Sequence, residues 1–391
     1  MTVRRADWRV ARAEASDAAR ALPRDLETVL LADAVGRTLA RDATSLARVP
    51  GSDVSAMDGW AVAGEGPWRL GPSIVAGRVA ADDGGSLPTG VARPVTTGAV
   101  VPDGTDRVLR SESGHVADGV LTADDDPRRP PHVRRAGEEI DRGDALITAG
   151  TLLTPPRVAV LALGGHDAVP VVTRPTVALA VLGDEVVAEG VPERGTVRDV
   201  FSVPVPRLLG SLGTASATTT RVADDLDATI AALDRPDRRL VVTTGGTAHG
   251  PTDHVRAALD RLGAELVVDG LAMRPGQPLV VARRGDTVYL CLPGNPMAAY
   301  VGLVVVGTAV VDGLLGRRPA PPGSVTLAVD VAHPRPGALV QAYRATPDGA
   351  VPTERQSSAM LRGLADADGL LVVPEGGARA GDVVPSLGLP W

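Results

Sequence analysis

The stretch LVVTTGGTAHGPTDHVRAALDRLGAELVVDGLAMRPGQPLVVARRGDTVYLCLPGNPM, residues 240–297, decides the fold of this chain. It opens with an apolar run, Leu240–Val242, which predicts a buried strand of a parallel sheet. The strand breaks at Gly245-Gly246, a polar loop runs to Asp253, and apolar residues at helical spacing then extend to Leu262. Strands and helices that alternate in this way predict a doubly wound α/β domain.

A second glycine-bearing loop follows a strand predicted at Thr287–Leu292. It reads Pro293-Gly294-Asn295-Pro296, and Asn295 is the only asparagine in the chain. Glycines let a ligand approach the backbone, and free N–H groups at a helix start favour anions. Either loop alone is typical of an ordinary turn. Two of them at successive strand ends, where α/β sheets bind their ligands, favour a binding site.

Composition excludes several classes of protein. A chain of 391 residues is too long for one ordinary core, so about two to four domains are expected. The net charge is −7 and no basic stretch is interleaved with aromatic residues, which argues against nucleic acid as a partner. All 40 positive side chains are arginine, because the chain has no lysine. The single Cys291 lies inside an apolar strand, which predicts a buried thiol and excludes a disulfide framework.

The start of the chain, MTVRRADWRVARAEASD, has no apolar segment of the secretory kind. The longest apolar stretch, Met297–Val311, contains two glycines and is shorter than the roughly 20 residues that span a bilayer. We expect it to be a helix buried against the sheet. The protein is therefore expected to be cytoplasmic and to make no membrane contact.

Glycine, proline and turn residues divide the chain into four parts. These are a mixed linker domain, a β-rich insertion, the doubly wound α/β domain and a C-terminal small β-barrel domain. Their expected residues are, in the same order, 22–48 with 133–170, 49–132, 1–21 with 171–316, and 317–391. Within the linker domain, the apolar spacing of Leu26–Leu39 predicts a helix.

The order of the motifs resembles that of the molybdopterin molybdenumtransferase family. The motifs TTGG-TAHGPTD, GLAMRPGQP and LPGNP are similar to the family patterns TSGGVSVGxxD, MxPGKP and LPGNPVS. Further matches are SAMDG at 55–59, TTGA at 96–99, GDE at 183–185 and QSSAML at 356–361. The resemblance therefore covers essentially the whole chain.

The resemblance implies an activity and its substrates. Family members take adenylylated molybdopterin and molybdate, insert the metal into the dithiolene and release AMP, with Mg²⁺ or another divalent cation assisting. It also implies a homodimer whose cleft combines loops of both subunits, so that Asp58 faces the 245–253 loop of the partner. Contacts with other proteins of molybdenum cofactor biosynthesis are expected as well.

The resemblance also assigns site residues. Asp58, Glu185 and Asp253 are the expected catalytic carboxylates, with Asp58 and Glu185 as metal ligands. The expected substrate-binding residues are Thr97, Gly245, Gly246, Arg274, Pro293, Gly294, Asn295, Pro296 and Ser358.

Simpler interpretations of these residues stay open. An isolated aspartate in a turn, like Asp58, usually caps its own backbone. The neighbouring carboxylates Asp184 and Glu185 favour a cation if they lie in a buried mouth, but they are also compatible with a solvated acidic loop. His249, which is new to its motif, is expected to be an exposed loop histidine rather than a catalytic base.

Several positions depart from the family patterns. Threonine, asparagine, two serines and a lysine are replaced by Leu182, Phe201, Ala248, Ala298 and Gln277. Each lost hydrogen-bond partner is worth about 1–3 kcal/mol in a buried site. The substitution Gln277→Lys is therefore predicted to strengthen molybdate binding, unless an arginine such as Arg274 supplies the charge.

Three functions stay open at the level of the sequence. The chain is an active molybdenumtransferase, a divergent paralogue that binds a pterin or nucleotide but inserts metal poorly, or a scaffold protein. The retained carboxylates favour the first function over the third. The lost hydroxyl groups and the lost lysine favour the second.

Overall fold

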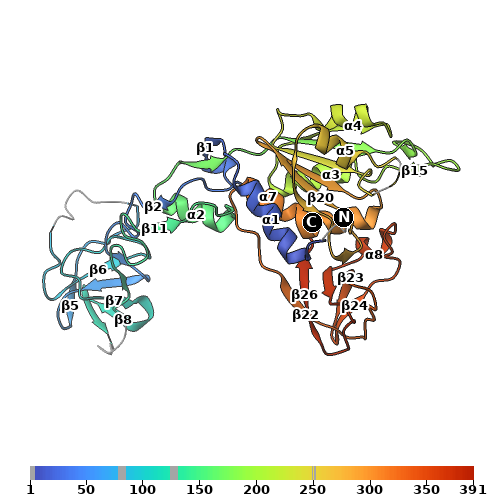
Figure 1. Ribbon diagram of the computed structural model, residues 1–391. Coiled ribbons are helices and arrows are strands. Elements are labelled where there is room, and N and C mark those ends of the chain that lie inside the picture. The colour runs from blue at the N-terminus through green and yellow to red at the C-terminus, as the bar shows by residue number, and fades with distance from the viewer. Residues whose placement is uncertain (1–4, 78–84, 124–130, 249, 251) are drawn as a thin grey trace.

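The computed structural model describes residues 5–77, 85–123, 131–248, 250 and 252–391. Within these ranges the molecule is elongated (Figure 1). A β-rich part lies at one end, a linker crosses the middle, and the α/β domain with the C-terminal β domain forms the other end. The candidate site belongs to the α/β domain.

The α/β domain is built on a six-stranded sheet with the order β16-β13-β17-β21-β20-β18. The first four strands in this order are parallel, whereas β20 pairs antiparallel with both β21 and β18. Their bounds are β13 Val177–Leu182, β16 Ala217–Val222, β17 Leu240–Thr244, β18 Glu265–Asp269, β20 Val280–Arg284 and β21 Thr287–Leu292.

Both faces of this sheet are covered by helices. Leu240 and Val242 of β17 pack toward α1 (Trp8–Arg20), α3 (Pro204–Leu212) and the long helix described below. Val241 between them packs toward α4 (Leu226–Leu233) and α5 (Val255–Arg261). Strands buried on both faces explain the continuous apolar runs of the sequence. The doubly wound fold class is thereby confirmed.

Cys291 of β21 is fully buried, as its apolar strand predicts. Burial raises the pKa of its thiol to about 12, so the side chain behaves as a small apolar group.

One long helix, Pro296–Leu314, lies in the core of the α/β domain. It consists of α6 (Pro296–Gly302), a π-helical turn (Leu303–Gly307) and α7 (Thr308–Leu314). Among the described residues it is the one helix long and apolar enough to cross a membrane, and it exceeds the apolar stretch predicted from the sequence. Because 83% of its most apolar window is buried inside the protein, it is a core helix.

The π turn has a specific partner on α1. The guanidinium of Arg12 donates from Nη1 to the carbonyl of Val305 at 2.8 Å and to Oγ1 of Thr308 at 3.0 Å. A π turn releases carbonyls from the regular helical ladder. Arg12 thus satisfies a carbonyl at this turn and fixes α1 against the long helix.

The linker contains two short antiparallel pairs and one helix. Their elements are β1 (Leu26–Leu30) with β12 (Ala168–Val172), β2 (Ala43–Thr44) with β11 (Ala145–Ile147), and α2 (Pro155–Leu163). The predicted helix over Leu26–Leu39 is wrong, since Leu26–Leu30 form a strand. The five-residue register with β12 satisfies the backbone here and overrides the helical spacing.

The β-rich part has a six-stranded sheet with the order β7-β4-β6-β5-β9-β8. The bounds are β4 Gly59–Val62, β5 Trp68–Leu70, β6 Val91–Val95, β7 Arg107–Arg110, β8 Gly114–Ala117 and β9 Val120–Ala123. Beside it, β3 (Val54–Ser55) pairs with β10 (Val133–Arg134), which crosses the boundary expected after residue 132.

The C-terminal sheet has the order β19-β23-β25-β26-β22, with β24 paired to β23. A bridge from Leu327, just after β22, to Ala350 of β24 connects the two ends of this arrangement into a small barrel. Because β19 lies before residue 316, this sheet also crosses an expected domain boundary. The bounds are β19 Met273–Arg274, β22 Gly323–Thr326, β23 Ala338–Thr346, β24 Gly349–Pro352, β25 Gly369–Val373 and β26 Val383–Gly388, with α8 Arg362–Ala365 between the last hairpins.

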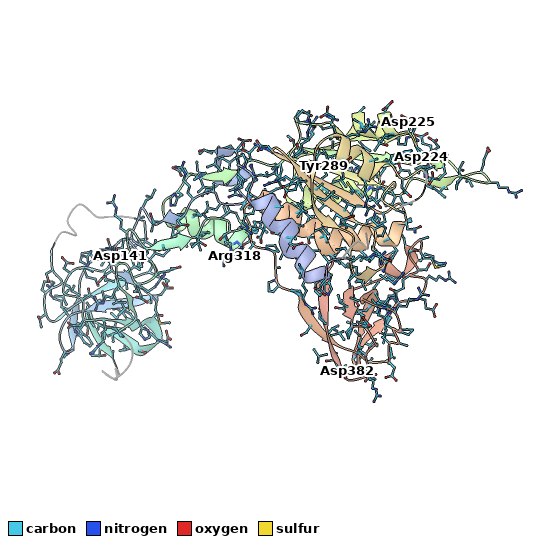
Figure 2. All side chains as sticks on the ribbon, viewed as in Figure 1. Asp141, Asp224, Asp225, Tyr289, Arg318 and Asp382 are labelled. Carbon is cyan, nitrogen blue, oxygen red and sulfur yellow. The ribbon has the colours of Figure 1, made fainter. Side chains whose placement is uncertain are left out.

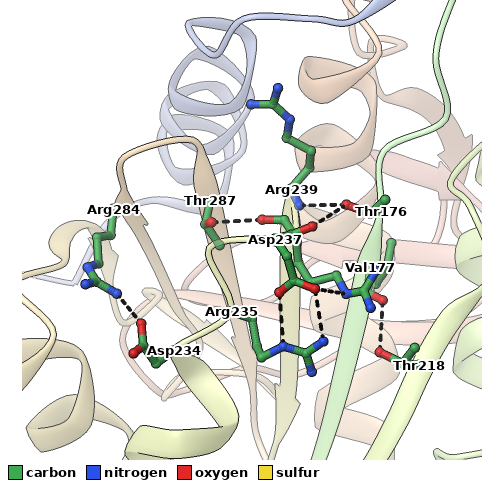
Figure 3. A network of polar contacts seen from close by, with 10 residues as sticks. Thr176, Val177, Thr218, Asp234, Arg235, Asp237, Arg239, Arg284 and Thr287 are labelled. Carbon is green, nitrogen blue, oxygen red and sulfur yellow. Dashed lines mark hydrogen bonds and ion pairs between the residues drawn. The ribbon is translucent and has the colours of Figure 1, made fainter.

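Polar contacts connect the loops at the amino ends of the parallel strands (Figure 3). Thr287 donates its hydroxyl to the carbonyl of Arg238 at 2.8 Å, and Thr176 donates to the carbonyl of Asp237 at 3.2 Å. Arg235 reaches the same Asp237 through Nε at 3.2 Å. Hydrogen bonds thus connect the starts of β13 and β21 to the loop before β17. The cleft of the candidate site lies at the opposite edge of the sheet.

Candidate functional site

A cleft of about 590 Å³ opens at the carboxyl ends of β13, β17 and β21. Both glycine-bearing loops line it, together with the loop after β13 and residues 197–201. Of the predicted site residues, the cleft brings together Glu185, Gly245, Gly246, Asp253, Pro293, Gly294, Asn295 and Pro296.

The two glycine-bearing loops lie directly against each other. β17 and β21 are neighbours in the sheet, and the N–H of Gly245 donates to the carbonyl of Leu292 at 3.0 Å. Gly245 has a φ of +89° and Gly246 a φ of +65°, which side chains other than glycine rarely adopt. A Cβ on Gly294 would lie 3.3 Å from the Cα of Gly245. Only glycines allow the two loops to approach this closely.

Asp253 and Arg256 hold the first glycine-bearing loop, residues 245–253, in place through hydrogen bonds. The carboxylate of Asp253 accepts from the backbone N–H of Ala248 at 3.1 Å and of Gly250 at 2.6 Å. Arg256 of α5 donates to the carbonyl of Thr247 and pairs with Asp269 at 2.8 Å. Asp253 was expected to be catalytic, and in this arrangement both of its oxygens already hold the loop.

Some backbone donors of the loops are used and others are free. Ala248 and Gly250 donate to Asp253, and Ala298, in the first turn of α6, donates to the carbonyl of Ser358 at 3.1 Å. The N–H groups that donate to no other described residue include those of Gly246, Thr247, Gly294 and Asn295. Such donors on two touching loops suit a tetrahedral oxyanion or a phosphate.

A buried hydroxyl group lies at the floor of the same cleft. Thr244 ends β17, is 1% exposed, and its Oγ1 has no hydrogen-bond partner among the described residues. An unpaired buried hydroxyl costs free energy, so such groups in native proteins usually have a ligand or water as partner. Thr244 therefore adds a donor to the anion-binding loops.

The charges that line the cleft are mainly negative. Glu185, Asp199, Asp224 and Asp253 face it, and Arg198 is the one arginine in the described lining. Burial raises the pKa of Asp199, but hydrogen bonds from Ser202 and from the N–H of Phe201 outweigh it, so this pKa lies below the ordinary value. Asp199 is therefore an anion at neutral pH.

Glu185 is the free carboxylate of the group. It lies in the exposed loop after β13, and its side chain makes no hydrogen bond or ion pair with any described residue. Gly183, with a φ of +131°, leaves room for it, since a Cβ there would lie 2.6 Å from Oε2 of Glu185. No three Asp, Glu, His or Cys side chains of the described ranges are grouped so as to hold a metal ion by themselves.

Asp58 and Thr97 lie together, but in the β-rich part. The N–H of Thr97 donates to Oδ1 of Asp58 at 2.6 Å and its hydroxyl donates to the same atom at 2.9 Å. These two bonds hold the pKa of Asp58 below its ordinary value. Within one chain this pair is far from the cleft: Asp58 directly precedes β4, whose partner strands β6 and β7 lie at the opposite end of the molecule from β15, which lines the cleft (Figure 1; side chains in Figure 2).

Arg274 and Ser358 do not line the cleft of the described chain. Arg274 is exposed in β19, where its backbone pairs with Leu339 of the C-terminal sheet. Ser358 is exposed, although its carbonyl accepts from Ala298 and its neighbour Ala359 reaches the cleft. His249 falls outside the described residues.

Two of the departures have become core packing. Leu182 is 6% exposed and lies under the first loop, with its Cδ2 3.3 Å from the position of a Cβ on Gly246. Phe201 is 6% exposed and stacks on Tyr300 with ring centroids 6.3 Å apart. Each of these two apolar side chains is buried, which stabilises the fold, and each also lines the cleft.

The other three departures lie in loops or at a helix start. Ala248 is exposed, and Ala298 is buried in the first turn of α6. Gln277 faces the guanidinium of Arg5. The contact involves Arg5 rather than Arg274, the arginine that the sequence suggested.

The polar cleft residues that were not predicted as site residues include Thr244, Arg198, Asp199 and Asp224. Thr244 precedes the glycine pair, so its place at a strand end was a usable signal. Asp224 follows β16, and its Oδ2 accepts from the N–H of Asp184 at 3.4 Å, which joins two strand-end loops. For Arg198 and Asp199 the sequence shows no pattern beyond an exposed polar segment.

Comparison with known proteins agrees with this arrangement. Three family models match in chain order: the MoeA N-terminal region (domain I and II) at residues 8–165, a probable molybdopterin binding domain at 178–312, and the MoeA C-terminal region (domain IV) at 326–389. The class of protein is thus one in which a doubly wound domain follows a β-rich part in the sequence and precedes a C-terminal β domain.

Relatives of the whole chain carry one name. The molybdopterin molybdenumtransferase of Bacillus subtilis is 30% identical over 91% of this chain and 87% of its own length. That of Synechococcus elongatus is 32% identical over 91% of this chain and 92% of its own. The chain belongs to the molybdopterin molybdenumtransferase family of enzymes, which confirms the resemblance of its motifs.

A solved structure shows the same fold. The molybdopterin biosynthesis MoeA protein of Pyrococcus horikoshii OT3 superposes with a TM-score of 0.82, covering 99% of this chain and 100% of that one at 22% identity.

Proposed function

We propose that this chain is an active molybdopterin molybdenumtransferase, which takes adenylylated molybdopterin and molybdate, inserts molybdenum into the dithiolene and releases AMP. The observation that carries this proposal is the group of free backbone donors on two touching loops above the unpaired hydroxyl of Thr244. The substrates are anions, and preorganised N–H and O–H donors bind anions without a cost of reorganisation.

A divalent cation such as Mg²⁺ is part of the proposal. The carboxylates in the cleft outnumber the arginine, so a phosphate-bearing substrate would meet net negative charge there. Mg²⁺ usually takes one or two carboxylates and completes its shell with substrate phosphates and water. Glu185 and Asp224 fit this role, because both line the cleft and Glu185 has no other partner among the described residues. Bound there, the cation would neutralise phosphate charge.

We further propose a homodimer in the cytoplasm. Asp58 and its partner Thr97 lie outside the cleft of their own chain, so a second subunit is needed to bring Asp58 to the 245–253 loop. Light scattering at micromolar concentration tests this proposal, with a mass twice the 40.0 kDa of the chain as the expected result. A monomer would remove the basis for a role of Asp58. We also propose contacts with other proteins of molybdenum cofactor biosynthesis, because the chain belongs to this family.

The second candidate is a divergent paralogue with weak metal insertion. The packing of Leu182 and Phe201 favours it, because both side chains occupy positions where the family patterns have hydrogen-bonding groups. Such a protein would bind the nucleotide-bearing substrate yet insert molybdate slowly.

Reconstitution separates the two candidates. Purified protein is mixed with adenylylated molybdopterin, molybdate and Mg²⁺, and the product is transferred to a molybdenum-free apoenzyme whose activity is measured. An active member yields cofactor and AMP in equal amounts. A paralogue binds the substrate but yields neither product above a control without protein, and a scaffold does not bind it.

A further inference from the structure

We propose that Arg198 is the residue that contacts the phosphate groups of the nucleotide-bearing substrate. The inference rests on the proposed function and deepens it, because it assigns the cationic contact that the cleft otherwise lacks. It concerns the diphosphate that joins the pterin part of adenylylated molybdopterin to its adenylate part.

The backbone places Arg198 at the mouth of the cleft. Arg198 ends β15 (Val197–Arg198), which pairs parallel with β14 (Val186–Val187) so that Arg198 lies opposite Val187. The N–H of Val197 donates to the carbonyl of Glu185 at 2.8 Å. Both Glu185 and Arg198 line the cleft, so an unpaired carboxylate and a guanidinium face the same space.

Two carboxylates of the cleft, Asp253 and Asp199, are already engaged by hydrogen bonds. Asp253 accepts from two N–H groups of the first loop, and Asp199 accepts from the N–H of Phe201 at 2.8 Å and of Ser202 at 2.9 Å. The side chain of Arg198 makes no hydrogen bond or ion pair with any described residue. Its charge is therefore not neutralised by the protein.

Phosphate is the ligand that this chemistry favours. A guanidinium presents parallel N–H donors that match two phosphate oxygens, and such charge-assisted pairs are about twice as strong as neutral hydrogen bonds. In the described lining, Arg198 is the only side chain that carries a positive charge. The glycine-bearing loops add neutral N–H donors, so one arginine with these loops can bind a diphosphate beside a divalent cation.

The test compares AMP, the product that keeps one of these phosphates, with adenosine, which has none. Titration calorimetry at fixed ionic strength uses the full chain, the variants Arg198→Gln and Arg198→Lys, and the control Arg194→Gln. Arg194 is exposed in the loop between β14 and β15, does not line the cleft, and its removal changes the net charge equally. Melting temperatures verify that all variants fold.

We expect Arg198→Gln to weaken AMP binding roughly tenfold to a hundredfold and to leave adenosine binding unchanged. Arg198→Lys keeps the positive charge but loses the paired N–H donors of the guanidinium, so its AMP affinity should lie between those of the wild type and Arg198→Gln. The AMP affinity of Arg194→Gln should match that of the wild type. The proposal is overturned if Arg198→Gln binds AMP as the wild type does, or if it loses AMP and adenosine equally.

The wild type itself separates this inference from the proposed function. If it forms cofactor but binds no AMP, the role of Arg198 is wrong and the proposed function stands. If it neither forms cofactor nor binds AMP, both fall together.

Discussion

The side-chain amide of Gln277 lies against the guanidinium of Arg5, near the other end of the chain. The backbone fixes this neighbour, because the N–H of Ala6 donates to the carbonyl of Gly270 at 3.1 Å and Ala272 donates back to Ala6 at 2.8 Å. A lysine side chain is one bond longer than glutamine. A lysine at position 277 would therefore place its ammonium group where Arg5 now places its guanidinium.

This contact changes the prediction for Gln277→Lys. Two positive groups about 4 Å apart repel by about 1 kcal/mol in bulk water and about 4 kcal/mol near a protein surface, so we expect Gln277→Lys to leave molybdate affinity unchanged or lower, contrary to the expectation from the sequence. Because neither Arg5 nor Gln277 lines the described cleft, Arg5→Gln and the double substitution Arg5→Gln with Gln277→Lys should leave molybdate binding nearly unchanged. Calorimetric titration with molybdate measures all three variants. Tighter binding by Gln277→Lys, or clearly weaker binding by Arg5→Gln, would contradict this expectation.

Removing charge at Asp58 or Glu185 should abolish metal insertion and leave the fold intact. Asp58→Asn keeps an oxygen for the N–H of Thr97, and Glu185→Gln changes an exposed side chain without a described partner. We expect melting temperatures within about 2 °C of the wild type, since surface changes of this kind cost little. Cofactor formation in the reconstitution assay is the measurement. The control is Glu189→Gln, an exposed glutamate outside the cleft lining, and normal activity of both test variants would remove Asp58 and Glu185 from the site.

Truncation of Asp253 should loosen the first glycine-bearing loop. Asp253→Ala removes the acceptor for the N–H groups of Ala248 and Gly250, which we expect to cost about 1–3 kcal/mol of unfolding free energy. Hydrogen exchange should accelerate at residues 245–248 and leave β13 protected. Asp260→Ala, on the exposed face of α5, is the matched control. A loop that exchanges at the wild-type rate in Asp253→Ala would mean that these two bonds do not hold it.

Restoring the family asparagine at position 201 should cost stability. Phe201 packs in the main core and stacks on Tyr300, so Phe201→Asn removes a buried aromatic ring and adds a polar group, at about 3–5 kcal/mol. Urea unfolding measures this loss. Val203→Asn, at a side chain that is 72% exposed, should change stability by less than about 0.5 kcal/mol. Equal effects of the two substitutions would show that Phe201 is not a core residue.

The hydroxyl of Thr97 should be visible in the titration of Asp58. The N–H and the hydroxyl of Thr97 lower the pKa of Asp58 from 3.8, so the bonds contribute above the ordinary pKa and are lost as the pH falls through the folded-state pKa. Thr97→Val keeps the N–H bond and removes the other, so the pKa should move back toward 3.8. An NMR titration of the Asp58 carboxyl carbon measures it. Thr96→Val is the control, because the Thr96 hydroxyl accepts from the N–H of Ala76 and does not touch Asp58. If the pKa of Asp58 shifts equally in both variants, the hydrogen bond from the Thr97 hydroxyl to Asp58 is not its cause.

Periodicity and glycine placement were sufficient to predict the α/β domain. The runs Leu240–Val242 and Thr287–Leu292 are apolar throughout because each strand is buried on both faces, and this pattern is local to the sequence. The loop after the first run was likewise predictable from its glycines, since the positive φ angles at Gly245 and Gly246 require that residue type. The strand Leu26–Leu30 was not, because its partner β12 lies far along the chain and the five residues have helical spacing.

The sequence by itself determined the family, the fold class and the cleft's two glycine-bearing loops, because strand burial, turn glycines and motif order are properties of short segments. Only the tertiary structure decided which side chains share the cleft. Arg198 and Glu185 meet through the pairing of β15 with β14, and Arg5 meets Gln277 through the bridge between Ala6 and Leu271. It also decided that Asp253 serves its own loop and that Asp58 stays outside the cleft of its chain. Such contacts join residues far apart in sequence, and their geometry depends on the packing of whole domains rather than on any local pattern.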